Sequence, residues 1–275
     1  MKFDFDKGWN EALGMIRSNF GLLAAIAGVL VFLPSAFAAI VFPSASLEAS
    51  LEGSSQPEMD QLRAALVTLF SEYWWLFVAI FLLTSFAQLG MFALLRRRAS
   101  PTVGEALAEG AKLLPTFVGA YILQIIAIIT PFVVLVSLPG AAGLRMFALF
   151  GALLAIPLTV YVSIKLSLVT AVIGIEGETN PIASLRRSWA LTKGNSFRLL
   201  GFFLLIVVAA AILVLLAGWI IGVVFALGGD EAASFGTALF AGLVDALGAV
   251  FSVSILAAIH AQLSRLSAAD EMPGA

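Results

Sequence analysis

Apolar residues along the chain are gathered into six long runs separated by more polar stretches. The runs are 20–42, 74–95, 117–138, 146–173, 199–227 and 235–259. Each is long enough to cross the ~30 Å hydrocarbon core of a bilayer as a helix. Because lipid offers no partners for backbone N–H and C=O groups, each run is predicted to be helical. The pattern predicts an all-α polytopic membrane helix bundle that forms a single integral membrane domain over residues 1–275.

Short amphipathic segments precede the first, third and fifth runs. Helix starts are predicted at Asp6, at Thr102 with Glu105 completing a capping box, and at Asn180 followed by Pro181. Amphipathic helices of this kind lie at the headgroup level of a membrane. The recurring order indicates three repeats of a cytoplasmic amphipathic helix plus a helical hairpin, all entering the membrane from the same side.

The positions of basic residues predict the orientation in the membrane. Of the 15 Lys and Arg residues, only Arg63 and Arg145 fall on the side opposite the N-terminus, while Lys165 lies within a run. By the positive-inside rule, both termini are expected to be cytoplasmic, in a bacterial inner membrane. The stretch 43–73 is expected to be an acidic outer loop with a short surface helix, and 55–58 has the order of a capping box.

Composition supports a membrane protein and excludes several other classes. The chain is 61% hydrophobic and 12% charged, far from the ~25% charged residues of soluble domains. A net charge of -2 argues against nucleic acid as a partner. With Cys 0 and His 1, no disulfide, metal site or other cofactor is expected. Ala36, Phe37 and Ala38 have the form of a signal-peptidase site, but acidic residues upstream favour a retained first span.

No pattern typical of an active site is found in the sequence. There is no glycine-rich phosphate loop and no nucleophile elbow. The sequence therefore predicts a protein that is not an enzyme.

The segment before the fifth run is the most basic of the three. Its candidate residues for binding lipid headgroups or a partner are Arg186, Arg187, Trp189, Lys193 and Arg198. Basic helices that carry tryptophan bind anionic lipid. The alternative interpretation is that these residues only brace the bundle and mark its topology.

Four polar residues inside the runs are candidate intramembrane site residues: Gln88, Gln124, Lys165 and Asp245. Lys165 either extends its amine toward the membrane surface or holds an anionic group. A charge near the bilayer centre is costly, so Asp245 is expected to face the bundle interior, with Lys165, Gln124 or Gln88 as candidate partners.

One stretch carries a resemblance to a known family. Its motifs are Lys165-Leu166-Ser167, Ile175-Glu176-Gly177, the segment from Asn180 to Gly194, and Phe197-Arg198. The stretch 158–201 resembles the membrane domain of some bacterial glycerophosphoryl diester phosphodiesterases, which also occurs in stand-alone multi-pass proteins. The resemblance implies a multi-pass membrane domain. It does not imply phosphodiesterase activity, which needs a soluble domain with a histidine and several carboxylates, whereas this chain has only His260.

These patterns favour a non-enzymatic membrane protein that organises or senses lipid through its basic helices, with anionic headgroups as its partners. The alternative is a small transporter or channel with a polar path near Lys165 and Asp245. Whether the chain forms a homo-oligomer or binds a soluble partner stays open at this point.

Overall fold

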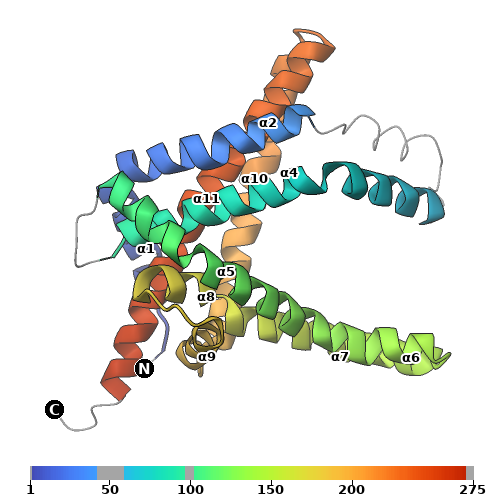
Figure 1. The fold of residues 1–275 in the computed structure, drawn as a ribbon, viewed down its shortest axis with the longest axis vertical. Helices are drawn as coiled ribbons and strands as arrows, with labels where there is room; N and C mark the ends of the chain where they lie inside the picture. The colour runs from blue at the N-terminus through green and yellow to red at the C-terminus, as the bar shows by residue number, and fades with distance from the viewer. Residues whose placement is uncertain (1, 42–58, 97–101, 271–275) are drawn as a thin grey trace. The chain divides into compact units, whose positions relative to one another are not determined.

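The computed structural model describes residues 2–41, 59–96 and 102–270, and these contain helices and no strand (Figure 1). The helices are α1 (Phe5–Ala27), α2 (Leu33–Val41), α4 (Met59–Leu94), α5 (Val103–Phe132), α6 (Leu138–Ala141), α7 (Arg145–Leu166), α8 (Val169–Ala171), α9 (Pro181–Leu191), α10 (Ser196–Ala226) and α11 (Asp230–Asp270). Three π-helical stretches interrupt them: η1 (Gly28–Phe32), η2 (Val133–Ser137) and η3 (Val172–Glu176).

The helices account for the six apolar runs. Within the described ranges, 6 helical stretches are long and apolar enough to cross a membrane. They are Phe5–Val41, Leu66–Leu94, Val103–Ala141, Arg145–Glu176, Ser196–Ala226 and Glu231–Ala268. Each predicted run overlaps one of these stretches, so the prediction of an all-α polytopic bundle is confirmed.

The first amphipathic segment begins α1, but its cap differs from the predicted one. The Asp4 carboxylate accepts the backbone N–H of Lys7 at 3.1 Å, and Asp6 lies inside the first turn. The prediction of Asp6 as the cap is wrong because the helix begins at Phe5, two residues before the Lys7 start that an Asp6 cap would give. Asn19 has non-helical angles (φ -124, ψ 16), so a kink separates this segment from the apolar run.

The second and third segments have the predicted starts. Thr102 and Glu105 form the capping box: the Thr102 hydroxyl accepts the Glu105 N–H, and the Glu105 carboxylate accepts the Thr102 N–H. However, α5 continues through Pro115 into the apolar run, so no separate amphipathic helix forms there. Only α9 is a separate helix, and the Asn180 side chain caps it directly before Pro181.

The predicted acidic loop is described only in part. From Met59 onward, its residues belong to α4, which continues without a break into the second apolar run. Residues 42–58, with the expected capping box at 55–58, lie outside the described residues.

The chain divides into two compact units that are described separately. Unit 1 comprises Met1–Phe20, Gln88–Val208 and Phe251–Ala275, and unit 2 comprises Gly21–Ala87 and Ala209–Val250. Helices α1, α4, α10 and α11 each run from one unit into the other along the chain. A single integral membrane domain therefore stays a prediction.

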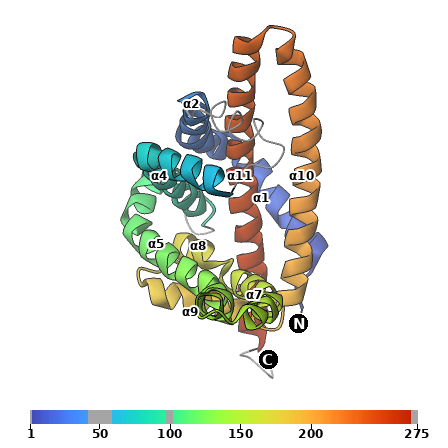
Figure 2. The same ribbon diagram turned by 90° about the vertical axis from the view of Figure 1, so that its right-hand side faces the viewer.

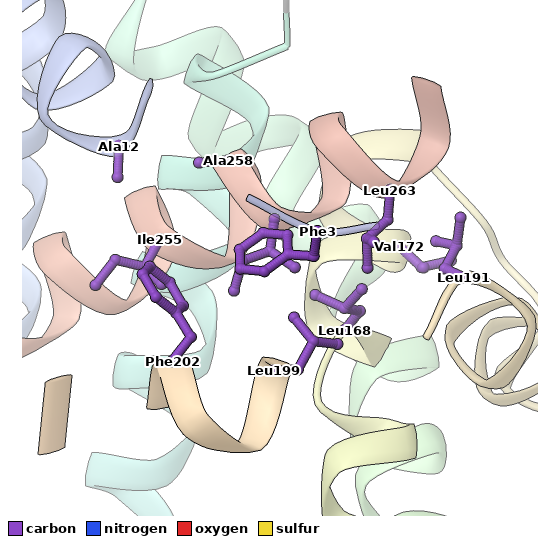
Figure 3. Packing of buried hydrophobic residues seen from close by; sticks show 11 residues of the cluster. Phe3, Ala12, Leu168, Val172, Leu191, Leu199, Phe202, Ile255, Ala258 and Leu263 are labelled. Carbon is purple, nitrogen blue, oxygen red and sulfur yellow. The ribbon is translucent and has the colours of Figure 1, made fainter. Parts of the chain in front are cut away.

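Unit 1 has a core around the N-terminal residue Phe3 (Figure 3), whose side chain is fully buried. Side chains from α10, from α11 and from the stretch after α7 gather there, and the Phe3 ring meets the Phe202 ring edge-on at 5.3 Å. The Phe3 backbone is held on both sides: its N–H donates to Asn195, and its carbonyl accepts from Arg198. Phe3 is thereby packed into the unit.

Helices α5, α7 and α9 pack against one another in unit 1 (Figure 2). The end of α4 also crosses α5 closely at two glycines, because a Cβ placed on Gly110 would lie 2.9 Å from the backbone nitrogen of Gly90. Two helix backbones can approach this closely in a membrane only where the residues at the crossing are small.

Unit 2 contains the turn between α10 and α11. Gly229 in this turn has a φ of +88°, a conformation that favours glycine. The two helices then run back along each other (Figure 2), with Gly218 facing the Phe240 ring. On another side of α11, Gly242 packs against η1 and α2, at Phe32 and Ala36.

Candidate functional site

The basic helix α9 is attached to a break in the fourth apolar helix. Helix α7 ends at Leu166, and the chain turns through Ser167 and Leu168 before α8 begins. Ser188 of α9 is fully buried; its hydroxyl donates to the Lys165 carbonyl at 2.8 Å and accepts the Leu168 N–H at 3.2 Å. One side chain thus satisfies two backbone groups that the helix end would leave without partners.

The Lys165 side chain lies beside this contact and is enclosed by aromatic rings. The residue is 2% exposed, and its Nζ lies 5.5 Å from the Tyr161 ring centre and 5.6 Å from that of Trp189. Both distances fit cation–π interactions. No carboxylate in the described part of the chain forms an ion pair with Lys165. The nearby positive charge of Lys193 repels the Lys165 amine. The amine is therefore not neutralised internally.

The five predicted headgroup residues fall into two groups. Arg186 and Lys193 are exposed and make no ion pair among the described residues, and Trp189 is 42% exposed. Arg187 and Arg198 each have a partner within the protein, although both side chains also reach the surface. Arg187 donates through Nε to Glu176 at 3.1 Å, and Arg198, on α10, donates to the Phe3 carbonyl at 2.9 Å. Arg186 and Lys193 are thus the members of this set that have no ion pair among the described residues.

Glu176 connects three parts of unit 1. It ends η3 and accepts from Arg187 of α9, while its Oε1 lies 2.8 Å from Nε2 of His260 on α11. The His260 side chain is buried. In the sequence, Glu176 stands out only as part of a motif, and His260 only as the single histidine. A carboxylate directly before a basic helix was the one local signal for this pair.

The other intramembrane candidates are not assembled around Lys165. Gln88 and Gln124 are half-buried in unit 1, whereas Asp245 is exposed on α11 in unit 2 and has no hydrogen bond or ion pair within the described ranges. The expectation that Asp245 faces the bundle interior stays a prediction, because its candidate partners lie in unit 1. Its helix buries Gly242 and Ala246 in this stretch, and Asp245 projects from a different side. The proposed pairing across the two units stays a prediction.

The fold and this arrangement define a helical multi-pass membrane protein with a buried, unneutralised lysine beside an exposed basic helix. No family model, curated protein or solved structure matches the chain. Within the described ranges, no group of three or more His, Asp or Glu residues is placed to hold a metal ion.

Proposed function

We propose that this membrane protein binds and organises anionic lipids at the exposed face of α9, in a role that is not enzymatic. The observation that carries the proposal is the position of Lys165, which lies between Tyr161 and Trp189 without an acidic partner among the described residues. A buried cation without a counter-ion is costly, and a lipid phosphate at the same place would offset that cost.

The exposed residues of α9 and of the turn that follows it have the character that such a lipid surface needs. Arg186 and Lys193 offer two free positive charges, and Trp189 offers an amphipathic ring suited to the membrane interface. A basic residue near an anionic surface contributes about 1 kcal/mol. Together, Arg186 and Lys193 therefore contribute about 2 kcal/mol, which corresponds to about a 30-fold difference in binding.

The proposal includes a location in the cell. By the positive-inside rule, the distribution of Lys and Arg supports α9 and both termini on the cytoplasmic side of a bacterial inner membrane, where anionic lipids are available. The resemblance to the membrane domain of glycerophosphoryl diester phosphodiesterases is consistent with this proposal, since that domain is also multi-pass and distinct from the catalytic one.

Lipid retention by the purified chain tests the proposal. The Arg186→Gln/Lys193→Gln double variant should retain about 30-fold less phosphatidylglycerol in native mass spectrometry, with little change for phosphatidylcholine. The double variant Arg63→Gln/Arg145→Gln is the matched control, because it removes the same charge from exposed positions on the predicted outer side. Equal phosphatidylglycerol retention by both double variants would remove the basis of the proposal.

A labelling experiment separates this proposal from transport. The chain has no cysteine, so a single Cys at position 165 or 245 is a unique target for water-soluble thiol reagents in intact membranes. Protection at both positions is expected for a packed bundle that binds lipid at its surface. Labelling at both positions would favour the transporter or channel alternative.

A further inference from the structure

The exposed side of α9 carries apolar and basic residues in alternation. Ile182, Arg186, Trp189 and Lys193 are all exposed, and they follow one another at intervals of four, three and four residues. Because an α-helix has about 3.6 residues per turn, these positions lie in one line along its surface. Lys193 stands in the turn after α9 but keeps to this line, since its N–H donates to the Ala190 carbonyl at 3.1 Å.

Arg186 and Lys193 form two separate positive poles of this line. They are seven residues apart, which is nearly two helical turns, or about 10 Å along the axis. The Trp189 ring lies between them, with the Lys165 amine 5.6 Å from its centre. Lys193 is close enough to repel this amine, so Lys165 adds positive potential at the Lys193 pole without having to touch a ligand.

No carboxylate in the described part of the chain offsets the two poles. The stretch from 165 to 193 has four basic residues and only two acidic ones, Glu176 and Glu178. Glu176 is held by the contacts described above, and Glu178 accepts the backbone N–H of Asn180 before α9 begins. The ion pairs of the described residues leave both poles free. This stretch therefore has two positive charges in excess.

We infer that the surface of α9 selects lipids with two phosphate groups joined by a short bridge, as in diphosphatidylglycerol. The inference rests on the proposed binding of anionic lipid at α9 and names the class of lipid. One phosphate lies at Arg186 and the other at Lys193, with the bridge over Trp189. Both basic side chains are long and flexible, so their charged ends can approach each other to match the two phosphates. Two phosphate diesters also balance the excess of two positive charges.

Apolar side chains flank both poles. Ile182, four residues before Arg186, is 54% exposed, and Phe197, four residues after Lys193, is 87% exposed. Exposed apolar residues beside basic ones insert into the boundary between headgroups and acyl chains. A lipid with two phosphates has acyl chains on both sides of its bridge, and each side meets one of these residues.

The selectivity arises because a lipid with one phosphate fills only one pole. A second such lipid must be immobilised separately, whereas the second phosphate of a bridged lipid is already held nearby. The extra contact with one basic residue corresponds to about a fivefold difference in binding. Total charge does not give the same preference. Phosphatidic acid, like other phosphate monoesters, carries a charge of about −1.5 to −2, but its single phosphate cannot occupy both poles.

Competitive lipid retention in native mass spectrometry tests the inference. The purified full-length protein in detergent is offered diphosphatidylglycerol, phosphatidic acid and phosphatidylglycerol at equal molar concentration. We expect one diphosphatidylglycerol per chain, retained about fivefold more tightly than either lipid with one phosphate. Equal retention of phosphatidic acid and diphosphatidylglycerol would overturn the inference, since total charge would then explain the binding.

Single variants link the preference to the two poles. Arg186→Gln and Lys193→Gln, made separately, should each bring the retention of diphosphatidylglycerol to that of phosphatidylglycerol, because each variant removes one pole. Arg17→Gln is the matched control, since Arg17 is exposed in the same unit, on the side predicted to be cytoplasmic. It removes the same charge and should keep the fivefold preference. A preference that survives in both pole variants, or that the control also loses, contradicts the inference.

The outcomes separate this inference from the proposal on which it rests. The Arg186→Gln/Lys193→Gln variant could lose phosphatidylglycerol while the unmodified protein shows no preference for the lipid with two phosphates. Lipid binding at α9 would then stand, and the selectivity would be refuted. If this double variant instead retains all three lipids as the unmodified protein does, the proposal and the inference both fail.

Discussion

The hydroxyl of Ser188 lies 2.8 Å from the carbonyl oxygen of Lys165, which it reaches from a helix 23 residues further along the chain. The same hydroxyl accepts the N–H of Leu168 at 3.2 Å. This contact joins α9 to the break after α7 and brings the Trp189 ring over the Lys165 amine. Helix α9 is therefore attached through a hydrogen bond to the backbone of Lys165. The proposed lipid site depends on the side chain of the same lysine.

Replacement of Ser188 by alanine should destabilise the protein. The Ser188→Ala variant leaves the Lys165 carbonyl with a weaker partner and the Leu168 N–H with none, at a cost of about 1–3 kcal/mol in the free energy of unfolding. Chemical unfolding of the purified protein in detergent measures the change. Proteolysis near α9 should also become faster, because the helix loses its attachment.

Ser184 provides the matched control for this experiment. It lies on the same helix and is equally buried, but its hydroxyl donates to the Asn180 carbonyl within its own helix. Ser184→Ala should therefore change the free energy of unfolding by less than Ser188→Ala. Equal losses for the two variants would show that burial, and not the contact with α7, determines the effect.

Glu176 should be coupled energetically to His260. The two side chains are 2.8 Å apart, and the histidine is buried, so removal of Glu176 leaves the buried His260 Nε2 without this partner. In a double-mutant cycle of Glu176→Gln and His260→Gln, we expect a coupling free energy of about 1 kcal/mol or more. Thermal unfolding of the four proteins in one detergent provides the measurement.

The pair formed by Arg265 and Glu11 serves as the comparison. Nη2 of Arg265 donates to both carboxylate oxygens of Glu11, but the Arg265 side chain is 40% exposed. Exposed ion pairs contribute ~0–1 kcal/mol, so the same cycle there should give a smaller coupling. A larger coupling for Glu11 and Arg265 would mean that burial of His260 adds nothing to its contact with Glu176.

Features set by neighbouring residues were predictable from the sequence. The capping box of Thr102 and Glu105 and the start of α9 at Asn180 and Pro181 both depend on residues within one turn. The apolar runs depend on composition over about 20 residues. Even locally, however, two aspartates near one helix start were not distinguished, and Asp4 takes the role predicted for Asp6.

The contacts of the candidate site join residues that lie much farther apart in the sequence than one helical turn or one apolar run. Glu176 and His260 are 84 residues apart, and no periodic pattern relates positions so distant along the chain. The same holds for the hydrogen bond from Arg198 to the Phe3 carbonyl, which gives a predicted headgroup residue a partner within the protein. For Asp245, the cost of a charge in lipid predicts an interior position but not which residues it would contact there, and its candidate partners lie in the other unit.

The buried amine of Lys165 should cost stability in the absence of a bound anion. Methionine has a similar length and no charge, so Lys165→Met removes the desolvation cost and loses about 1 kcal/mol of cation–π attraction. We expect the delipidated variant to unfold at a temperature equal to or higher than that of the unmodified protein. Lys112→Met, whose side chain is 72% exposed, should change the free energy of unfolding by less than about 0.5 kcal/mol.

The opposite result for Lys165 would be informative. A loss of several kcal/mol in Lys165→Met would mean that the amine has a strong partner in the folded protein. The uncompensated charge that motivates lipid binding at α9 would then be absent.

Finally, the crossing of α4 and α5 should depend on Gly110. A Cβ on Gly110 would lie 2.9 Å from the Gly90 backbone nitrogen, and a rigid helix backbone cannot yield as a flexible side chain does. Gly110→Ala should therefore destabilise the protein by about 1–3 kcal/mol, although alanine favours a helix over glycine. Gly104→Ala, on the same helix with open space around it, should be neutral or slightly stabilising. Stabilisation by both substitutions in chemical unfolding would mean that the two helices cross at a greater distance than the structure has them, because helix propensity would then be the only effect of the added methyl group.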